Sequence, residues 1–199
     1  INVRLTETEE KNLLLGTSKF GGRPDLPSDV EWPKSANGTP MEFVGQFNLE
    51  EAHKADMEEQ MPDHGIVYLF FSFSNAVEDY SDPQCFKAIY VEKADGLARR
   101  EYPDDVERKQ PSKKMDFIEY LSLPTFDWSD LEKMGMTEAE QDAYNELSGT
   151  HFEIVMLGHI LTVQGPMEYD CEEQRLHRNM GNLLPEKWEE KCQLFTQLD

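Results

Sequence analysis

The chain has 199 residues, with 40 acidic against 19 basic side chains, a formal net charge of −21 and an isoelectric point near 4.5. Such a surface repels phosphate backbones and anionic lipid, so nucleic acid and membranes are disfavoured as direct partners and a basic protein partner is favoured. An acidic surface that only keeps the protein soluble is the alternative interpretation.

Length and composition predict one globular domain over residues 1–199. The hydrophobic content of 38% and the aromatic content of 11% lie in the globular range. Three cysteines without a CxxC spacing, Cys85, Cys171 and Cys192, are typical of a reducing cytoplasm rather than of a disulfide scaffold. No apolar run approaches the roughly 18 residues that span a bilayer. We therefore expect a cytoplasmic protein.

The first residues of the chain predict one strand followed by a long loop that is rich in glycine and proline. Apolar and polar residues alternate from Ile1 to Thr6, which predicts a half-buried strand, and a helical turn is expected between Glu9 and Leu15. The stretch from Thr17 to Asn37 is too rich in glycine and proline for regular structure, so we expect an ordered loop that packs on the sheet. Within it, Trp32 is more typical of a loop anchor than of a ligand-stacking platform.

The next segments predict a strand, a helix and two further strands. Met41 to Phe47 is typical of a strand, and Asn48 is a candidate N-cap for a surface helix that runs to about Glu59. Ile66 to Phe73 is almost continuously apolar, which predicts a buried central strand. Phe86 to Val91 is expected to form the strand after it.

Beyond these strands the pattern predicts a polar segment, another strand and helices. Arg99 to Lys114 is nearly neutral overall, which argues against a phosphate-binding patch, and Met115 to Leu123 is expected to form a strand. Ser129 with Glu132 predicts a short helical turn. Thr137 with Glu140 forms a capping box for a helix that ends at Gly149. The apolar stripe of that helix, Ala139, Ala143, Tyr144 and Leu147, is expected to pack on the sheet.

Several motifs in fixed order carry a family resemblance. They are Lys19-Phe20-Gly21-Gly22, Pro24, Pro27, Trp32-Pro33, Phe43, Gln46-Phe47-Asn48, Met61-Pro62, Gly65, Tyr68 and Phe70-Phe71. With these motifs the chain resembles the YwqG-like family, a bacterial family of unknown function. The resemblance implies an α+β domain of mainly antiparallel sheet with a few short helices, built from two similar halves. It implies no established enzyme activity, cofactor or catalytic residue.

The two halves are expected at residues 1–123 and 150–199, with a helical connection over 124–149. Phe152 to Leu157 predicts another strand, and the motif Gly158-His159 with Gln164-Gly165-Pro166 parallels the first glycine loop. Gln197 aligns with Gln46 in the final apolar segment, where the chain stops before a matching hairpin. The resemblance therefore implies that the second half is incomplete in this chain.

The sequence contains few candidate catalytic or metal-binding motifs. The five histidines and three cysteines match no usual zinc spacing, so we expect no metal site. Nucleophile elbows, metalloprotease helices and phosphate loops are lacking from the sequence. The first hypothesis is therefore a non-enzymatic protein that binds a basic partner, with an immunity-type protein that neutralises a basic toxin as one version.

The second hypothesis is a small-molecule-binding domain or enzyme with a site between the halves. Its candidate contacts are Arg23, Trp32, Gln46 and Gln164, because polar and aromatic groups on loops held by a sheet often form sites. An amide inside an apolar strand, such as that of Gln46, is costly unless it is hydrogen-bonded. We favour the interpretation in which Gln46 satisfies backbone groups of the glycine loop over one in which it contacts a ligand.

Overall fold

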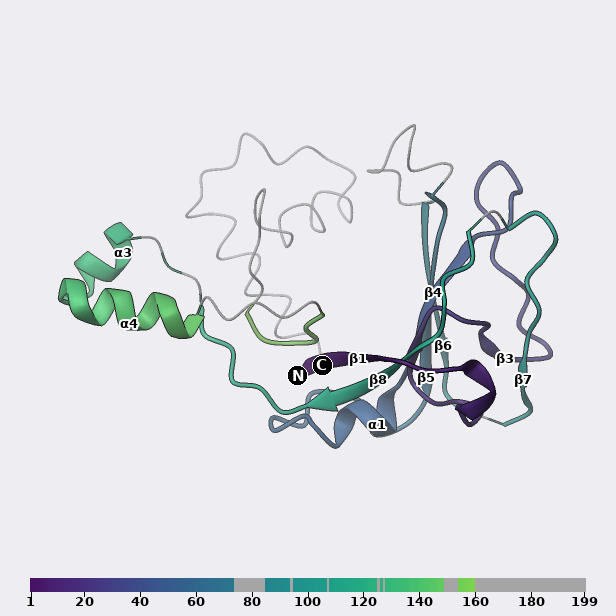
Figure 1. Ribbon diagram of the computed structural model, residues 1–199, viewed down its shortest axis with the longest axis horizontal. Coiled ribbons are helices and arrows are strands. Elements are labelled where there is room, and N and C mark those ends of the chain that lie inside the picture. Colours follow the sequence, from purple (N-terminus) through teal and green to yellow (C-terminus); the bar gives the residue numbers. More distant parts are fainter. Residues whose placement is uncertain are drawn as a thin grey trace. The chain divides into compact units, whose positions relative to one another are not determined.

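The computed structural model describes residues 1–73, 85–93, 95–106, 108–124, 126, 128–148 and 154–159. A six-stranded antiparallel sheet, a two-stranded sheet and a few short helices make up this part, so the fold is α+β, as predicted (Figure 1). The chain divides into two compact units, Ile1–His159 and Ile160–Asp199, and all the described residues belong to the first.

The described elements follow one another along the chain with connections of different lengths. They are β1 (Asn2–Glu7), η1 (Glu10–Asn12), β2 (Lys19–Phe20), β3 (Asp25–Pro27), β4 (Glu42–Asn48), α1 (Leu49–His53), β5 (Ile66–Phe71), β6 (Phe86–Val91), β7 (Leu97–Arg99), β8 (Lys113–Ile118), α3 (Trp128–Lys133) and α4 (Glu138–Ser148). The larger sheet has the order β1-β8-β2-β4-β5-β6, and the smaller sheet pairs β3 with β7.

The most apolar segment forms the core of the larger sheet. β5 lies between β4 and β6, and its side chains alternate between buried and half-buried positions, so the predicted interior strand is confirmed, although it ends at Phe71 and not at Phe73. Ile66, Tyr68 and Phe70 on its buried face pack with Phe43 of β4 and with Leu26 of β3. The main core therefore lies between one face of β4 and β5 and the smaller sheet.

The glycine- and proline-rich stretch holds more regular structure than its composition predicts. We expected no regular structure from Thr17 to Asn37, yet β2 and β3 lie within it, two and three residues long. β7 was also missed, and it pairs with β3. Between β2 and β3 the backbone turns through Gly21 and Gly22, both at positive φ. Glycine permits this conformation, so the glycines and prolines of this stretch shorten the strands without abolishing them.

Two helices differ from their predicted extent. Asn48 caps α1 as expected, since its side chain accepts a hydrogen bond from the Glu50 amide at 3.1 Å. The helix ends at His53 and not near Glu59. Beyond it, the Asp56 carboxylate accepts bonds from the amides of Glu58 and Met61 at 3.2 and 2.6 Å, and such local side-chain bonds compete with helix continuation.

The capping box of α4 is confirmed, but the predicted packing of its apolar stripe is wrong. Glu140 accepts bonds at 2.8 Å from the backbone amide and the hydroxyl of Thr137. Ala139, Ala143 and Leu147 of the stripe are exposed and Tyr144 is half-buried, whereas the polar Gln141 is buried. The helix therefore turns Gln141 and Tyr144 inward and the other stripe residues outward.

Other expectations are only partly covered by the described residues. β8 ends at Ile118 rather than at Leu123. In the predicted strand Phe152 to Leu157, Val155 forms an isolated bridge with Asn2 of β1. Gln164 and Gln197, and with them the duplication and the incomplete second half, lie outside the described residues. None of the helices in the described ranges is long and apolar enough to cross a membrane.

We predict that Gly21→Ala destabilises the protein more than Gly38→Ala. Both glycines have positive φ, 65° and 85°, so an alanine carries a comparable backbone strain of about 1–2 kcal/mol at either site. A Cβ at position 21 would lie 2.4 Å from the backbone oxygen of Pro111, whereas nothing lies within 4 Å at position 38. Denaturant unfolding should show an additional loss of about 1–3 kcal/mol for Gly21→Ala. Equal losses would contradict the close approach of the two backbones.

Candidate functional site

A buried carboxylate lies where the two sheets meet. Asp25 begins β3 and has no exposed surface. Its Oδ2 atom accepts hydrogen bonds from the Gly16 amide at 3.1 Å, from Lys19 Nζ at 3.1 Å and from Gln46 Nε2 at 2.9 Å. Its Oδ1 atom accepts a bond from Arg99 Nε at 2.8 Å. The carboxylate is therefore saturated by donors from four separate positions of the chain.

The donors come from elements of both sheets. Lys19 belongs to β2 and Gln46 to β4 of the larger sheet, while Arg99 belongs to β7 of the smaller one. Lys19 and Gln46 are directly paired across β2 and β4, so both side chains leave the same face of the sheet. We refer to Lys19, Asp25, Gln46 and Arg99 as the buried polar cluster.

Gln46 also joins the two ends of the glycine loop. Its Oε1 atom accepts a bond from the Asp25 amide at 2.8 Å, and its Nε2 atom donates to the Thr17 carbonyl at 2.9 Å. The amide thus satisfies backbone groups on either side of Gly21 and Gly22, which is the interpretation favoured from the sequence. Tyr68 adds a bond of 2.5 Å from its hydroxyl to the Asp25 carbonyl.

Electrostatics hold Asp25 ionised. Burial by itself raises the pKa of a carboxyl group, but the hydrogen bond from Arg99 and the charge of Lys19 together lower the pKa of Asp25 below its ordinary value. Burial lowers the pKa of Lys19, and the attraction of Asp25 opposes that shift. Lys19 Nζ also lies 3.6 Å from Glu10 Oε1. Two cations thus face two carboxylates, which keeps the interior near neutrality.

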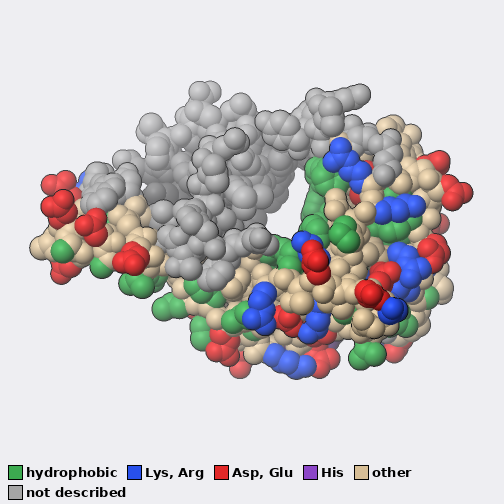
Figure 2. All heavy atoms as spheres, viewed as in Figure 1, with side chains coloured by type: hydrophobic (Ala, Val, Ile, Leu, Met, Phe, Trp, Pro, Cys, Tyr) green, Lys and Arg blue, Asp and Glu red, His purple; other side chains and the backbone are tan. Residues whose placement is uncertain are grey.

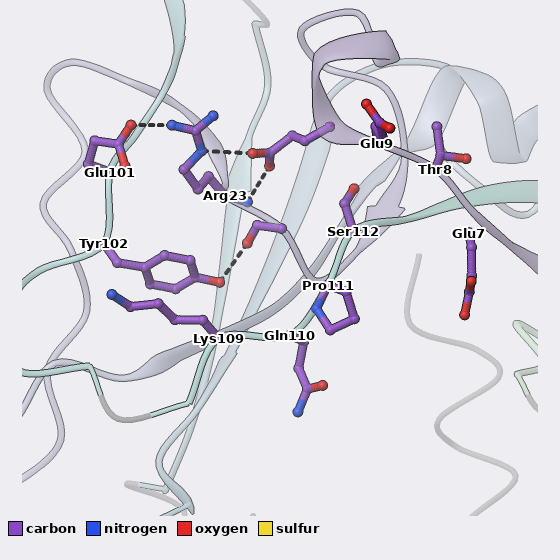
Figure 3. A pocket seen from close by; sticks show the side chains of 12 residues that line it. Glu7, Thr8, Glu9, Arg23, Glu101, Tyr102, Lys109, Gln110, Pro111 and Ser112 are labelled. Atoms are coloured by element: carbon purple, nitrogen blue, oxygen red, sulfur yellow. Dashed lines mark hydrogen bonds and ion pairs between the residues drawn. The ribbon is translucent and has the colours of Figure 1, made fainter.

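An open pocket lies beside the cluster (Figure 3). It has a volume of about 790 Å³. Its walls come from the end of β1, from η1, from the glycine loop and from the segments on either side of residues 103–108. The lining residues are Glu7, Thr8, Glu9, Glu10, Gly22, Arg23, Glu101, Tyr102, Lys109, Gln110, Pro111 and Ser112.

The one pocket residue predicted from the sequence, Arg23, is held between two carboxylates. Arg23 Nε donates to Glu10 Oε2 at 2.7 Å, and its Nη1 contacts Glu101. The hydrogen bonds from the Arg23 side chain and amide outweigh the effect of burial and lower the pKa of Glu10. Tyr102 donates its hydroxyl to the Gly22 carbonyl at 2.5 Å, and Lys109 Nζ lies 5.5 Å from the centre of its ring.

The structure separates the four candidate residues. Arg23 lines the pocket and Gln46 lies inside the buried polar cluster. Trp32 anchors its own loop, because its Nε1 atom donates to the Met41 carbonyl at 2.9 Å and its ring packs on Phe70 and Tyr102. Gln164 lies outside the described residues.

Sequence reasoning missed Lys19, Asp25 and Arg99. One signal was present, because Lys19 and Asp25 carry opposite charges at the two ends of the glycine loop. Arg99 gave no such signal, since it lies 74 positions from Asp25 in a segment with alternating charge. Within the described residues, no three side chains of the metal-binding types come together.

Three side chains of the buried polar cluster are closed to solvent. Asp25, Lys19 and Gln46 have no exposed surface and are bonded to one another, so none of them reaches a substrate. A general acid or base must contact the group whose proton it transfers. The pocket beside the cluster is open, and carboxylates outnumber cations among its lining residues.

Comparison with protein families identifies the family of the chain. Residues 18–199 match the sequence model of a family described as a domain of unknown function, DUF1963, so the chain belongs to that family. The match begins at the residue before Lys19 and includes the buried polar cluster, Trp32 and Arg23. A search of curated proteins finds no match to the chain.

We predict that Asp25→Asn lowers the free energy of unfolding by about 3–5 kcal/mol, because it removes the carboxylate that pairs with both Lys19 and Arg99 and leaves Glu10, 3.6 Å from Lys19 Nζ, to face both cations. Lys19→Met in the Asp25→Asn background should then cost less than it does alone, since it removes a buried cation that has lost its main partner. The coupling should be about 1–3 kcal/mol by a double-mutant cycle in denaturant.

The matched control for this cycle is Asp29→Asn, an exposed aspartate four residues further along the chain. Its effect should stay within about 0.5 kcal/mol. Additive effects of the Asp25 and Lys19 substitutions would show that the two charges do not interact.

Proposed function

We propose that this is a non-enzymatic protein that binds a basic protein partner. The family of the chain has no known function, so the proposal is based on the site and on the charge of the chain. The observation that carries the proposal is that three side chains of the buried polar cluster are closed to substrates from solvent. Lys19, Asp25 and Gln46 have no exposed surface and are hydrogen-bonded to one another, and the chain as a whole carries an excess of acidic charge.

The pocket supports the same proposal. Glu7 and Glu9 line it and are exposed, Glu9 in an ion pair with the exposed Lys11, while Arg23 is already neutralised by Glu10 and Glu101. A lysine or arginine side chain of a partner suits such a pocket, because charge-assisted bonds to carboxylates are stronger than bonds between neutral groups. The net charge of −21 would also steer a basic partner toward the protein and speed association.

Finer statements belong to this proposal as well. Membership of the YwqG-like family rests on the motifs from Lys19 to Phe71. A cytoplasmic location rests on the cysteine pattern. An immunity-type role, in which the protein neutralises a basic toxin, is the version for which a rapid electrostatic encounter matters most.

A second candidate is a small-molecule ligand in the pocket. The volume of about 790 Å³ lies within the usual range for such sites. The buried Oγ atom of Ser112, one of the lining residues, makes no hydrogen bond within the described residues. This candidate keeps Arg23 as a ligand contact, but Gln46 and Trp32 are engaged elsewhere.

We expect the immobilised protein to retain a basic protein from a lysate of its source cell at low salt and to release it in about 1 M salt, where the screening length is near 3 Å. Glu7→Gln with Glu9→Gln should reduce the retained amount. The control, Glu31→Gln with Glu92→Gln, removes the same charge from exposed positions outside the pocket and should change it less.

Retention of no protein at low salt, or of one equally well in molar salt, would contradict the electrostatic proposal. A metabolite that co-purifies with the protein and is lost with Arg23→Gln would favour the second candidate instead.

A further inference from the structure

The helix α4 is anchored by its polar and aromatic side. Tyr144 donates its hydroxyl to the Pro124 carbonyl at 2.7 Å, and its ring lies 6.0 Å from that of Phe126. Gln141 is buried and donates through Nε2 to the Met136 carbonyl at 2.9 Å. Because Gln141 and Tyr144 lie on one side of the helix, that side faces inward.

The opposite side of α4 carries the apolar residues. Ala139, Ala143 and Leu147 follow one another at intervals of four residues, so they form one stripe along the helix. Both alanines are exposed, and Leu147 is 65% exposed. Met134, in the turn between α3 and α4, is 57% exposed. An amphipathic helix normally buries such a stripe, so its outward position points to a binding surface.

Acidic residues surround this stripe. Residues 128–148 contain six acidic side chains and one basic one, Lys133. At 100° per residue, Glu140 lies along one side of the stripe and Glu146 along the other. Figure 2 shows acidic side chains gathered over α3 and α4, with hydrophobic side chains between them. We refer to the stripe with Met134 and these flanking acids as the outer face of α4.

We propose that the outer face of α4 docks a basic amphipathic segment of a protein partner. The apolar side chains of that segment would cover the stripe, and its lysines or arginines would pair with Glu140 and Glu146. The inference rests on the proposed function in requiring a basic partner, and it names the surface and the kind of segment.

Charge decides between the possible occupants of this face. A second copy of the chain would bring the same acidic helix against the first, and the like charges would repel. Nucleic acid and anionic lipid are repelled for the same reason. A basic segment gains from both the charges and the apolar stripe, and methionine at one end adapts to side chains of different shape.

The test uses two synthetic peptides and the intact chain at low salt. One peptide has 14 residues of leucine and lysine patterned as an amphipathic helix. The other is an oligolysine with the same number of lysines and no apolar face. Binding is measured by titration calorimetry and located by amide chemical shifts. We expect the amphipathic peptide to bind more tightly than oligolysine and to shift the signals of residues 134–148.

The variant for this test is Ala139→Lys with Ala143→Lys, which adds two positive charges to the stripe and keeps good helix formers. Its control is Glu31→Lys, which makes the same change in charge at an exposed position outside the helix. We expect at least about tenfold weaker binding for the double variant and less than twofold for the control. Circular dichroism and thermal unfolding verify that both variants fold.

The other outcomes overturn the inference in distinguishable ways. Shifts confined to the pocket residues, or equal binding of both peptides, would exclude the outer face of α4 while leaving a basic partner possible. Dimerisation that the double variant abolishes would make a second copy the occupant. Failure of both peptides to bind at low salt would contradict the inference and the proposed function together.

Discussion

The fold depends on the ionised carboxylate of Asp25 and its four donors. Lys19 and Gln46 come from the larger sheet, Arg99 comes from the smaller one, and Gly16 precedes β2. An arrangement that leaves one of these buried charges unpaired costs about 3–5 kcal/mol, a large part of the stability of a domain. We infer that the cluster favours the arrangement in which the two sheets and the glycine loop meet, because that arrangement pairs every charge of the cluster.

The same cluster shapes the surface that a partner meets. Lys19 and Arg99 are held inside, where Asp25 and Glu10 balance them, and Arg23 is engaged by Glu10 and Glu101. The three cations and the three carboxylates balance one another, so the net excess of acidic charge belongs to the other residues of the chain. The proposed binding of a basic partner depends on that excess.

Much of the sheet could be predicted because its signal is local. The apolar run from Ile66 to Phe71 is rich in β-branched and aromatic residues, which favour a buried strand. An amide within the apolar strand β4 is costly without hydrogen bonds, and Gln46 makes them with the neighbouring loop. The strands β2, β3 and β7 could not be found this way. They are two or three residues long, and the contacts that define them join distant parts of the chain.

The candidate site was less predictable than the fold. Arg23 was identified from its place in the glycine loop, but its carboxylate partners lie in η1 and just beyond β7, and no sequence pattern pairs them. The stripe of α4 shows the opposite problem. Its periodicity correctly predicts a helix, but periodicity alone does not say which side of the helix is covered. Tyr144 of the predicted stripe faces inward together with the polar Gln141, and the rest of the stripe is exposed.

The central claim is that folding stabilises the charged form of Asp25, and the pH dependence of unfolding tests it most directly. Because the folded pKa of Asp25 lies below the ordinary value of 3.8, its contribution should be complete above that pH and be lost as the pH falls through the folded pKa. Denaturant unfolding of the native chain should therefore lose stability more steeply in this acidic range than that of Asp25→Asn. Parallel curves for the two proteins would contradict the claim.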